Sequence, residues 1–416
     1  MFKFIHAADI HLDSPLHRLD AYEGAPVVEL RQATRRAFEN LVQAALTNEV
    51  DFVLISGDLF DGDWKDYNTG LFFISQVNRL KEAGISVYMA TGNHDAASRI
   101  TKALRWPENV HLCSIQRPET FKIEGLNVAV HGQSYSAPSV MTDISAQYPP
   151  PVSDCYNIGL LHTCLSGLGG HEPYAPCKVS DLTAKGYDYW ALGHVHTYSV
   201  MNEDPPVVFP GNIQGRHIRE SGPKGCLLVH VDDNDTTALT FVPLDVIRWQ
   251  MLEVDASNSN TEYDLVDCFG RSLEALVEKN EAHPLVVRVV FKGDTTAHDL
   301  VMGEIEHWIT EIRSLALTIG SGQVWVEKVL FQTNPPVGDK AMPKGDGAVA
   351  ELLQYLEELQ TDDGQLLELV QYLEDLDGKL PRELKSGTDG VDLSDSKWLR
   401  SILSQTRPML IRKLID

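Results

Sequence analysis

Short apolar runs alternate with longer helical patterns through the first half of the chain. The runs FKFIHAAD, DFVLISGD and ISVYMATGN are rich in β-branched and aromatic residues, and each ends at polar residues. Between them, VVELRQATRRAFENLVQAALTNE and TGLFFISQVNRLKEAG carry apolar residues at helical spacing, and the second stops at Gly84. This order predicts a parallel sheet with crossover helices. Further strand-like runs follow at LNVAVHGQ, NIGLLHT, YDYWALGHVH, PPVVFPGN and KGCLLVHV.

The pattern changes near residue 247. Three strand-like runs, RWQMLEVDA, PLVVRVVFKG and GQVWVEKVLF, alternate with helical patterns at 263–280 and 299–317, which predicts a small α/β unit. A segment rich in Pro and Gly follows, and beyond it leucines recur at helical spacing on both sides of the turn TDDG. We therefore predict a first domain at 1–245, an α/β capping domain at 246–332, a linker at 333–348 and a helical tail at 349–416.

Composition narrows the class of protein. Hydrophobic residues make up 43% of the chain and charged residues 23%, as in soluble globular proteins. No apolar run reaches the roughly 18 residues of a membrane helix, and His6 and Asp9 interrupt the apolar start, so we expect a cytoplasmic protein. The six cysteines form no CxxC pair, which argues against a zinc ribbon or a disulfide framework.

The chain is strongly acidic, with a net charge of −24. Residues 341–395 contribute much of this charge, with 4 Lys or Arg residues against 14 Asp or Glu residues. Such a balance repels polyanions at long range. It argues against a broad nucleic-acid-binding surface, but it allows a local basic groove or a metal site.

Ligand-type side chains follow five of the strand-like runs. Ligand sites in parallel α/β sheets lie beyond the carboxyl ends of the strands, so we expect these side chains to meet. The pairs Asp9/His11 and His194/His196 are each spaced by two residues, which lets both members point the same way. The full set is Asp9, His11, Asp58, Asn93, His94, Asp95, His162, His194 and His196.

Each of these residues alone also has a structural explanation. Asn and Asp are common in turns and caps, and a single buried histidine is usually a packing residue. Together they favour one mixed nitrogen and oxygen cluster. A set of several imidazoles with carboxylates and one amide oxygen, and no thiolate, suits manganese, iron or zinc and argues against calcium. The ligands are too many for one ion but suit two ions that share a bridging carboxylate.

The order of these motifs resembles a known family. D-x-H, G-D, G-N-H-D, H and G-H-x-H follow one another between residues 9 and 196, as in the calcineurin-like metallophosphoesterases. The opening HAADIHLDSPL, the run ISGDLFD, the small cap and the helical tail resemble the SbcD-type DNA repair exonucleases, especially their YhaO-like branch. The resemblance implies an α/β (α+β) fold, a four-layer αββα sandwich with a capping domain.

The resemblance also implies a role for each residue. Asp58 would bridge two divalent ions, and His94 would face the scissile phosphate without binding metal, oriented by Asp95. One departure is Asp61, where some members carry a histidine. One ion would be held by Asp9, His11, Asp58 and His196, and the other by Asp58, Asn93, His162 and His194.

The resemblance therefore implies a two-metal phosphodiesterase, a nuclease that acts on DNA ends. Manganese is the expected metal, with iron or zinc as alternatives. The expected partners are DNA, an SMC-like ATPase of the SbcC/YhaN type bound through the tail, and a second copy of the chain. Two other functions stay open: hydrolysis of a small phosphodiester such as a nucleotide ester, and a non-catalytic adaptor.

Two basic clusters are candidates for contact with DNA. Both could equally be solvated surface residues. The first lies in the loop FPGNIQGRHIRESGPKG and the second directly follows G-N-H-D. They comprise Arg216, His217, Arg219 and Lys224 in the first cluster and Arg99, Lys102 and Arg105 in the second.

Overall fold

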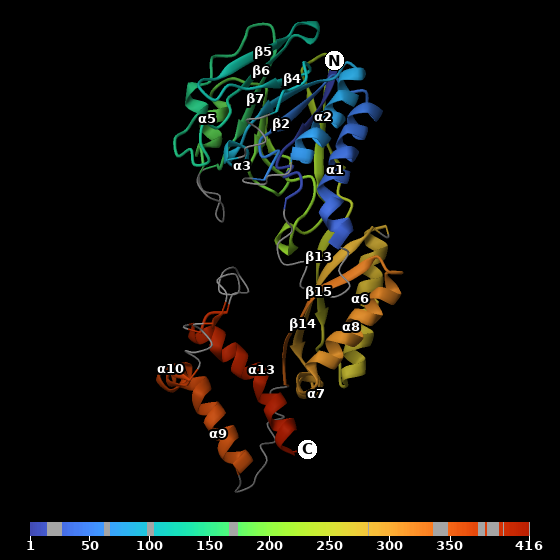
Figure 1. Cartoon of the computed structure of the whole chain (residues 1–416), viewed down its shortest axis with the longest axis vertical. Helices are drawn as coiled ribbons and strands as arrows, with labels where there is room; N and C mark the ends of the chain where they lie inside the picture. Colours follow the sequence, from blue (N-terminus) through green and yellow to red (C-terminus); the bar gives the residue numbers. More distant parts are fainter. Residues whose placement is uncertain are drawn as a thin grey trace. The chain divides into compact units, whose positions relative to one another are not determined.

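The computed structural model describes residues 1–14, 27–61, 67–97, 104–165, 174–281, 283–335, 348–372, 379–380, 391–393 and 395–415. The chain divides into two compact units (Figure 1). The first comprises Met1–Gln250 with His283–Val286, and the second Met251–Ala282 with Val287–Asp416. Most of the linker expected at 333–348 lies outside the described residues. Among the described helices, none has the length and apolar character needed to cross a membrane.

The described part of the first unit contains two six-stranded sheets. The strands are β1 (Phe2–Ala7), β2 (Phe52–Ser56), β3 (Ser86–Ala90), β4 (Val110–Leu112), β5 (Glu119–Ile123), β6 (Val128–Gly132), β7 (Tyr156–His162), β8 (Tyr189–Gly193), β9 (Ser199–Glu203), β10 (Pro206–Phe209), β11 (Gly225–Val231) and β12 (Thr237–Pro243). The first sheet has the order β12-β11-β1-β2-β3-β4, and the second has the order β5-β6-β7-β8-β10-β9.

Both sheets are mixed rather than purely parallel. Strands β1 to β4 are parallel neighbours, while β11 and β12 are antiparallel. In the second sheet β6, β7, β8 and β10 are parallel, and the edge strands β5 and β9 are antiparallel. The parallel core that the sequence predicts is present, but antiparallel strands extend it.

Strand β1 shows why the sheets stack. Successive side chains of a strand point to opposite faces. Phe2 and Phe4 enter the core between the two sheets, together with residues of β7 and β8, whereas Ile5 and Ala7 enter the core beneath the helices. Because both faces of the first sheet are buried, its central strands are almost continuously apolar.

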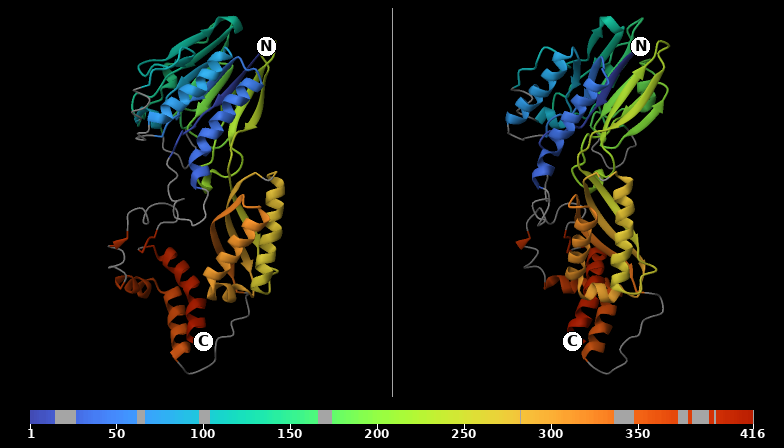
Figure 2. Two further views of the ribbon diagram at one scale, coloured as in Figure 1. Left: turned by 45° about the vertical axis from the view of Figure 1, so that its right-hand side comes forward. Right: turned by 90° about the vertical axis from the view of Figure 1, so that its right-hand side faces the viewer.

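Helices cover the outer faces of the two sheets. The helices α1 (Val27–Thr47) and α2 (Tyr67–Glu82) lie against the first sheet (Figure 2). Their residues Phe38, Leu41 and Phe73 enter its core. On the second, the short helix α5 (Val179–Thr183) places Leu182 in a core with Trp190. The layers are therefore helix, sheet, sheet and helix, which confirms the predicted αββα sandwich.

The second unit contains most of a three-stranded sheet. Its strands have the order β13-β14-β15, and the buried ring of Phe269 in α6 packs beside Phe291 of β14. The prediction of one helix at 299–317 is wrong, because α7 ends at Gly303 and a second helix, α8, begins at Ile305. The elements are β13 (Arg248–Asp255), α6 (Glu262–Lys279), β14 (Leu285–Asp294), α7 (His298–Gly303), α8 (Ile305–Ile319) and β15 (Val324–Asn334).

The tail forms α9 (Ala348–Thr361), α10 (Asp363–Gln371) and α13 (Ser396–Ile415). Leu366, Leu393 and Leu399 make a small core of their own. Arg400 Nε donates a 2.9 Å hydrogen bond to the carbonyl of Gln360, which ties α13 to α9, and α13 also contacts α7. The apolar stripes of the tail are therefore covered in part by one another.

Candidate metal centre

The carboxyl ends of the parallel strands bring the ligand-type residues together. The segment after β1 runs beside the segment after β2, with Asp9 N donating to the Gly57 carbonyl and His11 N to the Asp58 carbonyl, both at 3.0 Å. Asp9, His11 and Asp58 all have a positive φ, at 51°, 46° and 53°. Non-glycine residues rarely adopt this conformation, and backbone strain of this kind clusters at functional sites.

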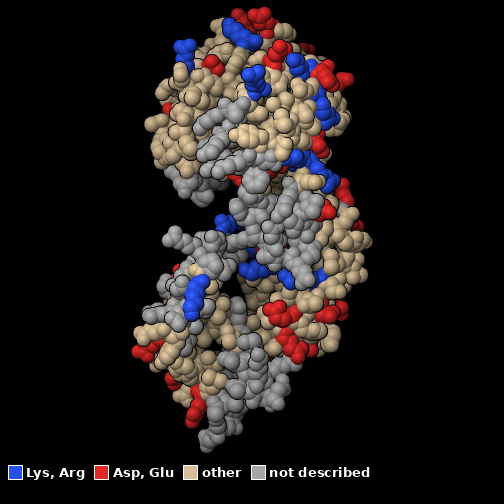
Figure 3. All heavy atoms as spheres, in the orientation of Figure 1, with Lys and Arg blue, Asp and Glu red and all other residues tan. Residues whose placement is uncertain are grey.

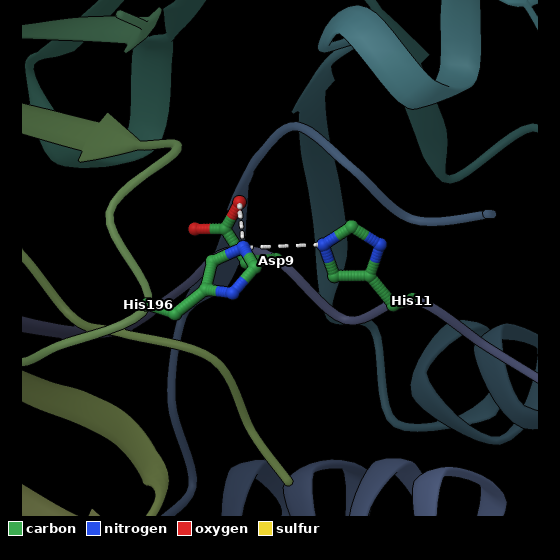
Figure 4. A group of neighbouring side chains, drawn as sticks. All are labelled: Asp9, His11 and His196. Atoms are coloured by element: carbon green, nitrogen blue, oxygen red, sulfur yellow. Dashed lines mark hydrogen bonds and ion pairs between the residues drawn. The ribbon is translucent and has the colours of Figure 1, made fainter. Parts of the chain in front are cut away.

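The first ligand group consists of Asp9, His11 and His196 (Figure 4). Nε2 of His196 lies 3.3 Å from Nε2 of His11 and 3.7 Å from Oδ1 of Asp9. Ligands of one ion with bonds of about 2.1 Å stand roughly 3 Å apart. The three side chains, which come from segments after β1 and β8, are therefore spaced for a common cation.

The second ligand group consists of Asp9, Asp58 and His162, so the two groups share Asp9, and a third set, His11, Asp58 and His94, shares one residue with each of them. Nε2 of His162 lies 3.4 Å from Oδ2 of Asp58 and 3.1 Å from Oδ1 of Asn93. Oδ2 of Asp58 also lies 3.9 Å from Nε2 of His11 in the first group. Asp58 thus stands between the two groups, where a bridging ligand would have to be.

The second nitrogen of two of these rings is already hydrogen-bonded. Nδ1 of His162 donates to the carbonyl of Ser56 at 2.8 Å, and Nδ1 of His196 donates to Oε1 of Glu220 at 2.7 Å. In the neutral tautomers each Nε2 therefore carries a lone pair, and that lone pair faces other acceptors. Such a set of acceptors is stabilised by a cation among them, so the residues fit divalent ions.

The ring of His194 lies near the metal centre but is not among its ligand groups. Its backbone N–H donates to both carboxylate oxygens of Asp9, at 3.1 and 3.0 Å. Its ring centroid lies 5.2 Å from that of His162. Its ring nitrogens are in none of the three ligand groups among the described residues. The structure therefore places His194 beside the second group, and its role as a ligand stays a prediction.

His94 is oriented by a residue other than the one expected. Nδ1 of His94 lies 2.7 Å from Oδ1 of Asp61, whose Oδ2 accepts a 2.6 Å hydrogen bond from Ser14. The expectation that Asp95 orients His94 is wrong. Asp95 is buried and accepts hydrogen bonds from the backbone N–H groups of Leu59, Phe60 and Gly92. Asp95 fastens the loop after β2 to the G-N-H-D turn.

Glycines are required where the ligand loops crowd together. A Cβ on Gly92 would lie 2.7 Å from Cε1 of His162 and closer still to Oδ1 of Asp58. A Cβ on Gly193 would collide with the carbonyl of Ser56, and Gly57 also has a φ of +95°. These contacts explain the glycines that precede Asp58, Asn93 and His194.

The most important residue that sequence reasoning missed is Glu220. Its carboxylate is 5% exposed and holds both His196 and Arg216. Burial alone would raise the pKa of Glu220, but the hydrogen bond from His196 and the charge of Arg216 hold it well below its usual range. The available signal was a lone glutamate in a basic loop, 24 residues after His196.

Electrostatics keeps His11 ready to bind metal. Burial, and next the positive charge of Arg216, lower the pKa of His11 to about 3. The ring is therefore neutral near pH 7 and can offer a lone pair. Burial also raises the pKa of Asp9, because desolvation disfavours the charged carboxylate.

The expected DNA contacts fall into three groups. Arg99 and Lys102 lie outside the described residues, and Arg105 is exposed. The prediction that Lys224 contacts DNA at the surface is wrong, because Lys224 is 6% exposed and donates to the carbonyl of His196 at 2.8 Å. The third group is Arg216, which lies within the site, and His217 and Arg219, which are exposed. On the face in Figure 3, basic and acidic side chains of the first unit are interspersed.

Comparisons with known proteins agree with this geometry. Residues 2–198 match the calcineurin-like phosphoesterase family, and residues 249–334 match the middle domain of the metallophosphoesterase YhaO. The chain is 38% identical over 294 residues to the metallophosphoesterase YhaO of Bacillus subtilis, covering 70% of this chain and 71% of that protein. The chain belongs to the YhaO family of metallophosphoesterases. As a YhaO-type protein, it is a hydrolase with a centre suited to divalent metal ions.

More distant relatives carry a more specific name. Two proteins called DNA double-strand break repair protein Mre11, from Methanopyrus kandleri and Sulfurisphaera tokodaii, are 25% and 23% identical to this chain. The alignments cover 78% and 73% of this chain, and 70% and 77% of the two relatives.

Proposed function

We propose that this YhaO-type protein is a two-metal phosphodiesterase that cleaves DNA at its ends together with an SMC-like ATPase. The observation that carries the proposal is the pair of ligand groups that share Asp9 and meet at Asp58. The names of the Mre11 relatives support DNA as the substrate. Six unpaired cysteines suit a reducing compartment, the cytoplasm.

Each residue has a task in this mechanism. Asp9, His11 and His196 would hold one ion and His162 with Asn93 and His194 the other, with Asp58 between them. When bound, the ions, manganese in this proposal, supply positive charge that acidifies water and polarises phosphoryl oxygens. Ser56 and Glu220 fix the ring orientations through the Nδ1 atoms of His162 and His196.

His94 would act on the phosphate rather than on a metal. Its side chain is 40% exposed, and Nδ1 is occupied by Asp61 at 2.7 Å. Burial by itself would lower the pKa of His94, but the hydrogen bond to Asp61 and the charges of Asp58 and Asp61 raise it. Nε2 is then suited to donate a proton, or a hydrogen bond, to an oxygen of the scissile phosphate.

A partner is proposed because the chain itself is acidic. A net charge of −24 gives weak intrinsic attraction to DNA. The tail exposes apolar residues, with Tyr355 at 45%, Tyr372 at 85% and Ile402 at 40%. We propose this surface as the docking segment for the ATPase. The same acidity favours a second candidate function, hydrolysis of a small phosphodiester.

The test compares linear duplex DNA with bis-p-nitrophenyl phosphate as substrates, each with Mn²⁺ and with EDTA. We expect Mn²⁺-dependent hydrolysis of both, abolished by EDTA and by Asp58→Ala. Cleavage of the small ester alone, even with the ATPase added, would replace the nuclease proposal by the second candidate. Full activity in EDTA or in Asp58→Ala would refute the two-metal mechanism.

A further inference from the structure

A single buried carboxylate organises the loop that follows β10. Oε1 of Glu220 accepts from Nδ1 of His196 at 2.7 Å and from Nη2 of Arg216 at 3.1 Å. Oε2 accepts from the backbone N–H of Arg216 at 2.8 Å and from Nδ2 of Asn212 at 2.9 Å. A Cβ on Gly215 would lie 2.7 Å from the backbone carbonyl of Glu220, so these two residues approach each other closely across the loop.

The carboxylate holds two side chains with different roles, a candidate metal ligand and a cation. It holds the imidazole of His196, whose Nε2 points into the first ligand group. It also holds the guanidinium of Arg216, which is 15% exposed and lies 3.2 Å from Nδ1 of His196. A buried carboxylate without partners would be destabilising. The hydrogen bonds from His196 and Arg216 stabilise the negative charge of Glu220.

Arg216 has donors left for a ligand. Its Nη2 is used by Glu220, while Nη1 makes a long contact of 3.5 Å to Oγ of Ser14. Ser14 donates to Asp61, the residue that orients His94. Nη1 of Arg216 therefore points toward the same side of the centre as His94, where a phosphate oxygen would be bound. Guanidinium groups bind phosphate oxygens through several N–H groups at once.

We propose that Glu220 is a positioning residue that aims His196 at one metal ion and Arg216 at the phosphate. This inference rests on the proposed function. It predicts a selective effect, because Glu220 contacts a ring of the first ligand group only. The second group is held differently, through the carbonyl of Ser56 on His162.

The test is calorimetric titration of Mn²⁺ into the metal-free full-length chain. Glu220→Gln keeps the shape but removes the charge. It should weaken one of two Mn²⁺ sites by about 10–100-fold, the usual effect of losing a residue that orients a ligand, and leave the other unchanged. The matched control is Glu327→Gln, which breaks a part-buried pair with Arg288 (2.8 and 2.6 Å) in the second unit and should change neither site.

Arg216→Ala separates the two tasks. It removes a positive charge beside the ions, so Mn²⁺ binding should be unchanged or tighter. KM for bis-p-nitrophenyl phosphate should rise about tenfold or more, since a charge-assisted hydrogen bond is lost. Glu220→Gln should show the metal defect as well as the rise in KM.

The outcomes are distinct. If the wild-type chain does not bind two Mn²⁺ ions, the proposed function itself fails. If it binds two and Glu220→Gln weakens neither site, or both equally, the positioning role is overturned. Weakened Mn²⁺ binding in Arg216→Ala overturns it as well. If Glu220→Gln lacks a cooperative unfolding transition, Glu220→Asp, which retains the charge but is one carbon shorter, is titrated and judged in the same way.

Discussion

Replacing Gly92 with alanine tests the crowding of the metal centre directly. The added Cβ would lie 2.7 Å from Cε1 and 2.8 Å from Nε2 of His162, and closer to Oδ1 of Asp58. Favourable contacts between carbon atoms begin at about 3.5 Å, so the ring or the turn must move by roughly 0.8 Å. Because the interior is close-packed, His162 and Asp58 would be displaced together.

The expected consequence is a folded protein with a damaged centre. Displacement of two candidate ligands should weaken Mn²⁺ binding by about 10–100-fold, on the scale of ligand-orienting mutations. Turnover should fall by about 10²-fold, which is the usual effect of misplacing a reacting group by an ångström. Calorimetric titration with Mn²⁺ and the rate of bis-p-nitrophenyl phosphate hydrolysis measure the two effects, and thermal unfolding checks the fold.

The matched control is Gly125→Ala. A Cβ on Gly125 would have nothing within 4 Å, so this change should leave metal binding and turnover as in the wild-type chain. If Gly92→Ala binds Mn²⁺ and turns over substrate as well as Gly125→Ala, the ligand loops tolerate a methyl group. The inference that glycine is required beside Asp58 and His162 would then be refuted.

Three other changes test separate parts of the molecule. His94→Ala should keep its metal but lose about 10²–10⁴ in turnover; metal loss, measured by elemental analysis, would instead make His94 a ligand. His6 is buried, and burial lowers its pKa from 6.5 to about 3. Between pH 6.5 and about pH 3 the unfolded chain therefore binds one more proton at this residue than the folded chain does. In EDTA, stability should therefore fall as pH drops through that window, by up to about 1.4 kcal/mol per unit, and His6→Leu should lose this part of the slope in chemical unfolding. Charge reversal of the exposed Arg219 should flatten the salt dependence of DNA binding by about one unit, and an unchanged slope would place the DNA elsewhere.

The buried strands were predictable because both of their faces are apolar. Continuous apolar runs mark β1, β2, β3, β7 and β8, and polar residues beyond their carboxyl ends marked the site. The strands β4, β5, β9 and β12 were not predicted, because they are edge strands whose residues are mostly exposed or half-buried and mix polar with apolar side chains. Their pairing depends on neighbours distant in sequence, which a local pattern does not encode.

The orienting partners were the hardest part to predict. Asp95 is adjacent to His94 in sequence, but the short helix α3 (Asn93–Ala97) turns its carboxylate back toward Gly92 and the loop after β2. Asp61 reaches His94 only because two separate loops converge. Strand ends predict which residues gather at a site, but hydrogen bonds between loops decide which of them touch.

The loop around Glu220 also changes the argument about DNA. From sequence, its four basic residues formed one candidate surface. In the structure Lys224 donates a hydrogen bond to the carbonyl of His196, and Arg216 donates one to Glu220. His217 and Arg219 are the exposed members of the loop. Phosphate contacts made by so few cations release few counterions and add little affinity on a chain of net charge −24. Arg216, held inside the centre, can help to orient a single phosphate group, but it cannot follow a duplex along its length. If the substrate is DNA, the described residues of this loop therefore supply little of the contact with the duplex, and we expect a second protein to supply more. The proposed ATPase would supply this contact without any change in the metal centre itself.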